Sequence, residues 1–164
     1  MISLIASIQK KDRGLGYKNN LLYQISHDMK RFRDITMGNV VIMGRKTWES
    51  LPEKFRPLRA RENIVITRDK NYVASGANLV NSIEDAFNVL KNTFPEKNCF
   101  IIGGEEIYKQ TIARADRLYL TIIEGDKKAD TFFPDYSDFK KVISKESRLD
   151  EKTGVGFEYV VLER

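Results

Sequence analysis

Short apolar runs alternate with helical stretches along most of the chain, and this alternation constrains the fold more than any other feature. The runs VVIM at 40–43 and FIIG at 100–103 are apolar throughout, as expected for strands that are covered on both faces. Strands that alternate with helices predict a mostly parallel sheet with helices on both sides. Near the end of the chain two strand candidates follow one another, which indicates an antiparallel edge. The predicted fold class is α/β, with a mostly parallel central sheet, an antiparallel C-terminal edge and helices on both faces.

We expect a single domain that spans residues 1–164. A chain of 164 residues can bury one substantial core and is too short for two ordinary domains, and it contains no repeat, low-complexity segment or linker. Ser82 and Asp85 form a predicted N-cap and capping box, and Pro95 marks the end of that helix. The expected helices are Ser26–Thr36, Thr47–Leu51, Ser82–Thr93 and Glu105–Ala113. The expected strands are Ile2–Ile8, Val40–Met43, Asn63–Thr67, Ala77–Val80, Cys99–Ile102, Leu118–Glu124, Lys141–Ser147 and Phe157–Leu162.

The cysteine and histidine counts exclude several kinds of site. Cys99 is the only cysteine, so the chain can form neither an internal disulfide nor a cysteine metal cluster. Its place in the apolar run CFII favours a buried, inert thiol over a nucleophile. His27 is the only histidine, which excludes a multi-histidine zinc site and argues against a histidine-assisted hydrolase, unless His27 itself is the base. We expect no metal site.

Charge and hydropathy narrow the range of partners. The net charge is +5, but basic residues alternate with acidic ones, which favours a solvated surface with a few anion sites over a nucleic-acid groove. No apolar run approaches the length of a membrane span. The N-terminal run MISLIASIQKKD has neither a preceding basic segment nor a cleavage site, so we expect a first strand that stays in the mature protein rather than a secretion signal. These features predict a cytoplasmic monomer that binds a small molecule, without nucleic-acid or membrane partners.

Two strand-to-helix junctions carry residues that suit a phosphate group. In open α/β sheets, ligands bind beyond the carboxyl ends of the strands. At the first junction a strand ends at Gly44, and the side chains of residues 45–47 and the helix-start amides are available to a phosphate. At the second, Gly103 and Gly104 would let the backbone approach a pyrophosphate closely. Neither junction has a GxGxxG or GxxxxGK[ST] pattern, and a glycine after a strand is more often only a turn.

A third strand end adds a hydroxyl and a guanidinium. The run IVITRD at 64–69 ends in Thr67 and Arg68, a pair suited to a phosphomonoester. One pyrophosphate site together with one monoester site is what NADP requires, in contrast to NAD. On spacing alone, however, Arg68 is more often an ordinary surface arginine.

Apart from the phosphate-binding strand ends, Asp28 and Phe32 form a second candidate binding site. They lie four residues apart on the helix expected at 26–36, so both project from one face, which Ile35 continues. A buried, unpaired carboxylate costs several kcal/mol, roughly, unless a ligand with hydrogen-bond donors pairs with it. The simpler explanation is an acid in the first turn that favours the helix dipole.

In order and spacing, these segments resemble dihydrofolate reductases over nearly all of residues 1–162. Any one segment is modest evidence, whereas all eight in register make a strong match. The resemblance implies NADPH-dependent reduction of dihydrofolate to tetrahydrofolate, in support of one-carbon and thymidylate metabolism. The matching segments are ISLIAS at 2–7, a glycine-bearing loop at 14–23, Asp28 with Phe32, VIMGRKTWES at 41–50, RENIVITRD at 61–69, IIGGEEIY at 101–108, LYLT at 118–121 and DTFFP at 130–134.

The resemblance also implies a role for each matching position. Asp28 would be the single active-site carboxylate, anchoring the pterin amino group and ring nitrogen, with Thr121 holding it through a hydroxyl. Arg61 would pair with the α-carboxylate of the folate tail, and the Gly103–Gly104 peptide bond would be cis. The other implied substrate contacts are Ile5, Ala6, Met29, Phe32, Leu51 and Arg56. The implied NADPH contacts are Ala6, Ser7, Leu15, Gly16, Asn19, Asn20, Gly44, Arg45, Lys46, Thr47, Thr67, Arg68, Ile102, Gly103, Gly104, Glu105, Glu106, Ile107 and Tyr108.

The implied reaction passes a hydride from NADPH to the carbon of the dihydrofolate imine, while the adjacent nitrogen takes a proton. Hydride transfer needs stacked rings, exclusion of water and a protonated imine. The implied site has one carboxylate and no other evident acid nearby. We therefore expect Asp28 to polarise the pterin and a water admitted past Tyr23 to deliver the proton, with burial raising the pKa of Asp28 in the free enzyme.

The chain departs from the family pattern near the cofactor and the tail. Leu22-Tyr23 stand where Pro-Trp is usual, which changes the shape of the loop that closes over the cofactor. The usual PLPGR reads PLRAR at 57–61, which keeps the final arginine and alters the turn before it. Glu105 stands where a third glycine is common. None of these changes removes a catalytic group.

Two other functions remain open from the sequence. A reductase of another pterin, or of a pyrimidine intermediate in flavin synthesis, would use a related fold, but Asp28, Phe32 and Arg61 together favour folate because that rival need not bind a glutamate tail. A non-catalytic nucleotide- or nucleic-acid-binding module would bind polynucleotide with a steep salt dependence and would not turn over NADPH. The lack of a basic block or an interleaved aromatic platform argues against this module.

Overall fold

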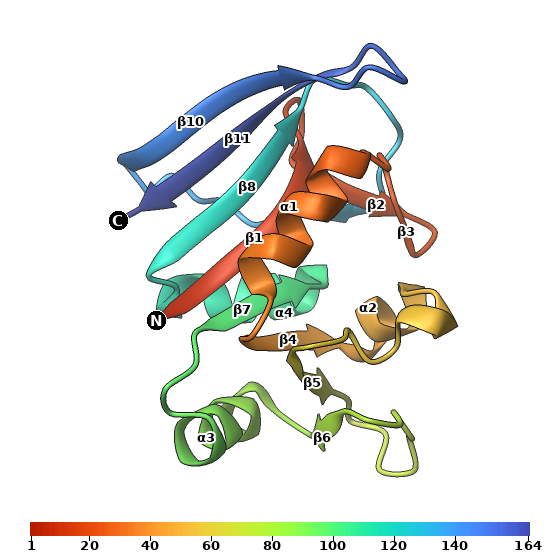
Figure 1. The fold of residues 1–164 in the computed structure, drawn as a ribbon, viewed down its shortest axis with the longest axis vertical. Coiled ribbons are helices and arrows are strands. Elements are labelled where there is room, and N and C mark those ends of the chain that lie inside the picture. Colours follow the sequence, from red (N-terminus) through yellow and green to blue (C-terminus); the bar gives the residue numbers. More distant parts are fainter.

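An eight-stranded sheet forms the centre of the structure (Figure 1), a computed structural model that describes residues 1–164. Its strand order is β10-β11-β8-β1-β7-β4-β5-β6. All neighbours from β8 to β6 pair in parallel, whereas β11 pairs antiparallel with β8 and with the edge strand β10. The bounds are β1 (Ile2–Gln9), β4 (Val40–Gly44), β5 (Glu62–Ile66), β6 (Asn78–Val80), β7 (Cys99–Gly103), β8 (Arg117–Ile123), β10 (Lys141–Leu149) and β11 (Gly156–Glu163).

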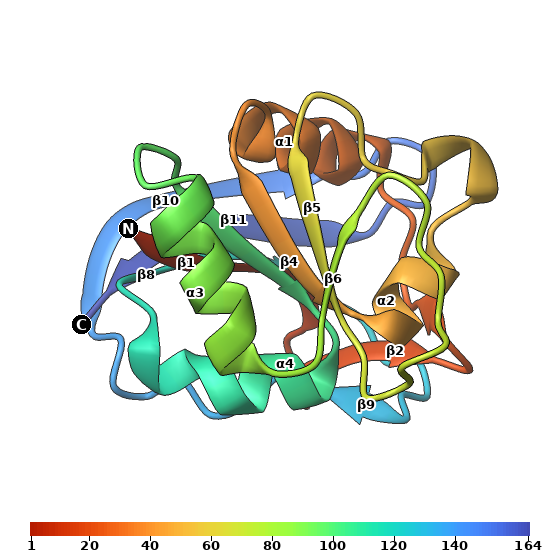
Figure 2. The same cartoon turned by 90° about the horizontal axis from the view of Figure 1, so that it is seen from below.

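Helices cover both faces of this sheet, with α1 on one side and α3 and α4 on the other (Figure 2). Alternate residues of β4 divide between the two layers: Val41 and Met43 pack with Trp48 below α1, while Val40 and Ile42 pack with the helices of the opposite face. Because both faces are covered, β4 carries no polar side chain at any position. The predicted α/β fold class is confirmed. The helices are α1 (Ser26–Thr36), α2 (Arg45–Ser50), α3 (Ile83–Thr93) and α4 (Glu105–Thr111), with the 3-10 turns η1 (Glu53–Phe55) and η2 (Ile112–Arg114).

The predicted elements agree with the structure to within two residues, and the differences have local causes. Helix α2 begins at Arg45 rather than Thr47, because Gly44 is itself the N-cap and the helix follows the strand directly. Helix α4 ends at Thr111, two residues before the predicted Ala113, and the chain continues as η2. The predicted N-cap of α3 is confirmed, since Ser82 Oγ accepts a hydrogen bond from the Asp85 amide at 3.0 Å.

A second, three-stranded sheet has the order β3-β2-β9 and was not predicted from the sequence. Its strands are β2 (Gly14–Tyr17), β3 (Asn20–Leu21) and β9 (Thr131–Phe132). They are too short for a recognisable pattern, and the pairing of β2 with β9 joins segments more than 100 residues apart. A Cβ atom at Gly16 would lie 2.7 Å from the Asn20 carbonyl oxygen, so the tight turn requires glycine there.

A buried glutamine fixes the segment that follows β1. The side chain of Gln9 is fully buried. Its Oε1 accepts hydrogen bonds from the Tyr23 hydroxyl and the Lys127 amide, both at 2.7 Å, and its Nε2 donates to Asp12 Oδ1 and to the Lys127 carbonyl, both at 3.1 Å. Lys127 Nζ also donates to the Leu22 carbonyl at 2.7 Å and lies 4.4 Å from the centre of the Tyr23 ring. All polar atoms of Gln9 are thus satisfied, and they tie the segment 12–23 to the loop around Lys127.

No helix combines the length and the apolar character that a bilayer crossing requires.

The central position of β7 makes a direct prediction about stability. Ile101→Ala should lower the free energy of unfolding by about 2–5 kcal/mol, because it opens a cavity in a fully buried part of the sheet. The matched control is Ile143→Ala on the edge strand β10, where the side chain is 42% exposed and the loss should be about 0.5 kcal/mol or less. Urea unfolding of both variants measures the difference. Equal losses would contradict the assignment of β7 to the core and of β10 to the edge.

Candidate active site

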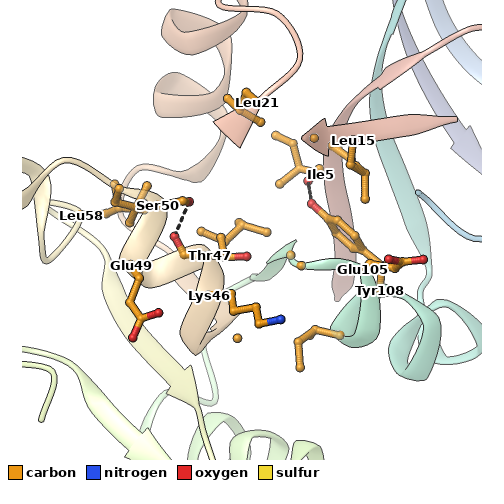
Figure 3. A pocket seen from close by; sticks show the side chains of 18 of the residues that line it. Ile5, Leu15, Leu21, Lys46, Thr47, Glu49, Ser50, Leu58, Glu105 and Tyr108 are labelled. Carbon is orange, nitrogen blue, oxygen red and sulfur yellow. Dashed lines mark hydrogen bonds between the residues drawn. The ribbon is translucent and has the colours of Figure 1, made fainter. Parts of the chain in front are cut away.

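One long cleft, with a volume of about 2270 Å³, collects almost all of the predicted site residues. It follows the carboxyl ends of the parallel strands, where β4, β5 and β7 lead into their loops and helices, as expected for an open α/β sheet. Figure 3 shows Lys46 and Thr47 on one side of this cleft and Glu105 and Tyr108 of α4 on the other. Only Tyr23 and Arg56, among the predicted substrate, cofactor and catalytic residues, do not line it.

The two glycine junctions meet inside the cleft because β4 and β7 are neighbouring parallel strands, with Met43 opposite Gly103. A Cβ atom at Gly104 would lie 3.2 Å from Thr47 Oγ1, and one at Gly44 would lie 3.2 Å from Ile107 Cγ1. Gly103 has a φ of +121°, and the expected cis bond between Gly103 and Gly104 is present. The backbone is therefore exposed to a ligand where any larger residue would fill the space. The geometry fits a pyrophosphate.

We call the backbone at Gly44, Gly103 and Gly104 the glycine cradle. Three cationic side chains line the cleft close to it in the sequence or in the fold. Arg45 is partly committed, since its guanidinium lies 3.8 Å from Glu49, 3.5 Å from Asp69 and 5.6 Å from the Tyr72 ring centre. Lys46 and Arg68 also line the cleft, and no carboxylate lies within 4.0 Å of either charge. Two cations without a carboxylate partner, beside the glycine backbone, would suit a polyanion.

Asp28 lies in the cleft away from the glycine cradle, held by the sheet. The Thr121 hydroxyl on β8 donates a hydrogen bond to Asp28 Oδ1. Ser7 stands opposite Thr121 in the pairing of β1 with β8, and its hydroxyl also faces the carboxylate. Burial raises the pKa of the Asp28 carboxyl above its ordinary value, and it prevails over the hydrogen bond from Thr121, the charge of Arg31 and the hydrogen bond from Ser7, which all lower it. The expectation of a raised pKa is confirmed.

A buried tyrosine of α4 lines the cleft beside Ile5 and Gly103. The Tyr108 hydroxyl donates a hydrogen bond of 2.7 Å to the Ile5 carbonyl (Figure 3). Its ring packs on Phe133 with 4.9 Å between the ring centres, and burial raises the pKa of the hydroxyl. The hydroxyl is therefore a fixed donor that joins α4 to β1, and it aligns Ile5 with the cleft.

The opposite end of the cleft carries Arg61 beside Phe32. The guanidinium lies 5.7 Å from the Phe32 ring centre, and it donates to Thr36 Oγ1 at 3.0 Å and to the Arg59 carbonyl at 3.1 Å. Asn63, which the sequence analysis did not single out as a site residue, holds this turn. Its buried amide accepts a hydrogen bond from the Leu58 amide and donates to the carbonyls of Leu58 and Arg61, at 2.8–2.9 Å. No motif distinguishes such an asparagine, because its role depends on a turn that only the fold defines.

Tyr23 and Arg56, which were predicted as site residues, do not line the cleft in the free protein. The Tyr23 hydroxyl is bound to Gln9, outside the cleft. Arg56 donates to the backbone carbonyl of Leu51 at 2.7 Å and to that of Glu49 at 3.1 Å, so its guanidinium supports the loop after α2. The catalytic role of Tyr23 and the tail contact of Arg56 stay predictions.

The cleft also has walls that the sequence analysis did not assign. They include the start of α3 at residues 81–84, the exposed Phe55, and the cations Lys30, Arg33 and Arg59. Ser82 was identified only as a helix cap. Cys99 is fully buried, and burial raises the pKa of its thiol to about 12, in agreement with an inert thiol.

The sequence of the chain matches one family of known proteins. The family model described as dihydrofolate reductase matches residues 1–164. Dihydrofolate reductase from Bacillus subtilis (strain 168) is 36% identical over 166 aligned positions, which cover 100% of this chain and 95% of the relative. Dihydrofolate reductase from Staphylococcus aureus (strain Mu50) is 34% identical over 154 positions, which cover 93% of this chain and 91% of the relative.

The raised pKa of Asp28 predicts how stability depends on pH. A folded pKa above the unfolded value gives a contribution that is present below the unfolded pKa and is lost as the pH rises through the folded pKa. Asp28→Asn should therefore raise the Tm of the free protein at pH 7, and the difference from the parent should shrink toward pH 4, near the ordinary pKa of about 3.9. Thermal unfolding between pH 4 and pH 8 measures it.

Asp34→Asn on the same helix is the matched control with the opposite sign. The hydrogen bonds from Lys30 and Arg33 lower the pKa of Asp34, so its contribution is present above the unfolded pKa and is lost as the pH falls. This variant should have a lower Tm than the parent at pH 7. A drop in Tm at pH 7 for Asp28→Asn would contradict the description of Asp28 as a carboxylate that burial disfavours.

Proposed function

The chain belongs to the dihydrofolate reductase family, and we propose from this premise that it reduces dihydrofolate to tetrahydrofolate with NADPH as the hydride donor. The observation that carries the proposal is a single carboxylate, Asp28, held by Thr121 in the same cleft as a glycine cradle and free cations. A pterin ring at Asp28 and a nicotinamide beside Ile5 and Tyr108 would share one enclosed space. The product supports one-carbon and thymidylate metabolism.

Asp28 would anchor the pterin by accepting hydrogen bonds from its amino group and ring nitrogen. Thr121 donates to Oδ1, so Oδ2 remains available to the ligand. Ile5, Ala6, Met29, Phe32 and Leu51 line the cleft between Asp28 and the tail end and would contact the pterin and benzoyl rings. At that end, Arg61 uses Nη1 and Nε within the protein and keeps Nη2 for the α-carboxylate of the folate glutamate.

The residues of the glycine cradle fit NADPH. Thr47, Gly103 and Gly104 would contact the pyrophosphate, and Lys46 and Arg68 would contact the additional phosphate that distinguishes NADPH from NADH. When bound, NADPH supplies the hydride that the imine carbon of dihydrofolate accepts. Ser7 and the segment 14–20 would cover the nicotinamide and exclude water. The remaining cofactor contacts are the other predicted residues that line the cleft.

Protonation of the imine nitrogen would depend on Asp28 and on a water near the pterin. A carboxyl with a raised pKa can polarise the ring, and Thr121 and Ser7 keep its orientation. Tyr23 would act from the segment that covers the cofactor: its bond to Gln9 holds this segment, and the proton-carrying water is proposed to enter past it.

We propose that the working unit is a monomer, since a chain of 164 residues can bury one substantial core of its own. We propose a cytoplasmic location.

The decisive test is the loss of NADPH absorbance when purified protein is mixed with dihydrofolate. We expect turnover that prefers NADPH to NADH. We expect Asp28→Asn to lower kcat by at least about 100-fold, because the polarising carboxylate is removed while the shape of the cleft is kept. The residual rate of the variant should rise as the pH falls, since solvent acid can then protonate the imine.

Asp138→Asn is the matched control. Asp138 is an exposed carboxylate that does not line the cleft, and its only ion pair is with Arg164. Its kcat should equal that of the parent. Near-normal turnover by Asp28→Asn at neutral pH would refute the catalytic role of Asp28, and a parent protein that oxidises no NADPH would refute the proposed function.

A further inference from the structure

A second cavity, with a volume of about 370 Å³, lies between α1 and the strands β10 and β11. Arg31 of α1 and Tyr159 of β11 line this cavity, and neither lines the substrate cleft. Asp28, three residues before Arg31 on the same helix, lines the cleft instead. Residues three apart are neighbours on a helix surface. Helix α1 therefore brings a guanidinium close to the active-site carboxylate from outside the cleft.

An aromatic ring holds the Arg31 side chain in place. Its guanidinium carbon lies 4.3 Å from the centre of the Tyr159 ring, a distance typical of a cation–π contact. Tyr159 stands directly opposite Thr121 in the antiparallel pairing of β11 with β8, so both side chains leave the same face of the sheet. Thr121 is the residue whose hydroxyl donates to Asp28. The guanidinium, the ring and the carboxylate are thus neighbours on one face of the sheet.

The charge of Arg31 has no ion-pair partner. No carboxylate lies within 4.0 Å of it, although the side chain is partly buried. Glu146 on β10 lines the same cavity, but it pairs with Arg148 at 2.7 Å. Water screens partly buried charges less than exposed ones. Arg31 can therefore act on Asp28 without touching it.

Asp28 and Arg31 each favour the charged form of the other. Burial raises the pKa of Asp28, whereas the hydrogen bond from Thr121 and the charge of Arg31 lower it. Burial lowers the pKa of Arg31, and the charge of Asp28 raises it. This mutual effect is expected of opposite charges that lie close together. The other titratable groups around the pair are Tyr159 on β11, Tyr119 on β8, Glu146 and Arg148 on β10, and His27, Lys30 and Asp34 on α1.

We propose that Arg31 is a positioning residue that keeps the Asp28 carboxylate ionised from outside the cleft, and so sets the pH range in which Asp28 accepts hydrogen bonds from the pterin. An ionised carboxylate only accepts hydrogen bonds, whereas a protonated one also donates. Because Thr121 donates to Oδ1, a proton on Oδ2 would face the donors of the pterin. The inference rests on the proposed function and adds a residue that touches neither substrate nor cofactor.

The test is a pH titration of the Asp28 carboxyl by carbon NMR in the free protein, with the signal identified by its loss in Asp28→Asn. Arg31→Met removes the charge and keeps a chain that can pack on Tyr159. The midpoint of the Asp28 titration should then move up by about one pH unit, as expected when a nearby opposite charge is lost. Arg31→Gln, a second neutral variant, should give the same rise. Arg31→Lys keeps the charge and should restore most of the parent midpoint.

Lys140→Met is the matched control, because it removes the same net charge from an exposed residue that lines neither cavity. It should leave the Asp28 midpoint unchanged. An unchanged midpoint in the neutral Arg31 variants would overturn the inference. An equal rise in Lys140→Met, or in Arg31→Lys, would also overturn it, because the effect would then not come from the charge at this position.

The pH profile of kcat/KM for dihydrofolate gives the functional reading, because kcat/KM reports the ionisations of the free enzyme. Its apparent midpoint should move up in Arg31→Met and return in Arg31→Lys. A profile that stays fixed while the NMR midpoint moves would overturn the role in pterin binding. A parent protein that oxidises no NADPH would refute the proposed function, and the NMR titration would still decide whether Arg31 acts on Asp28.

Discussion

The hydrogen bond from Thr121 to Asp28 joins two parts of the chain that are 93 residues apart, and the candidate site depends on it. Asp28 stands in the first turn of α1, and Thr121 stands on β8, next to β1 and Ser7. The bond therefore fixes the start of α1 against the sheet and turns a carboxylate into the cleft. Without it, the same acid would be only a favourable charge at a helix start.

The protein accepts an electrostatic cost at both ends of this cleft. Burial disfavours the charged form of Asp28, and cations with few partners line the glycine cradle and the tail end. Neither feature stabilises the free chain. Both would become favourable with the proposed ligands, which would supply donors at Asp28 and anions at Lys46, Arg68 and Arg61. The paired, covered strands below provide the rigid support that such a site needs.

The sequence predicted the main sheet and most of the cleft because their signals are local or follow from one rule. Apolar runs such as VVIM define strands, and parallel strands bring Gly44 and Gly103 to one edge. Most of what the sequence did not predict depends on contacts between distant segments, whereas the contacts of Asn63 are local but belong to an irregular turn. The β2–β9 pairing, the Gln9 network and the support of Arg61 by Asn63 have no motif. Tyr23 and Arg56 were predicted from position in a family pattern, and their partners here are Gln9 and backbone carbonyls.

The central claim is that Asp28 and the glycine cradle bind two ligands side by side. A crystal structure of the protein with oxidised cofactor NADP and folate measures this most directly. The account predicts the pterin within hydrogen-bond distance of Asp28 Oδ2, the pyrophosphate against Gly103 and Gly104, and the nicotinamide between them beside Ile5. A pterin bound away from Asp28, or a cofactor bound outside the cradle, would contradict it.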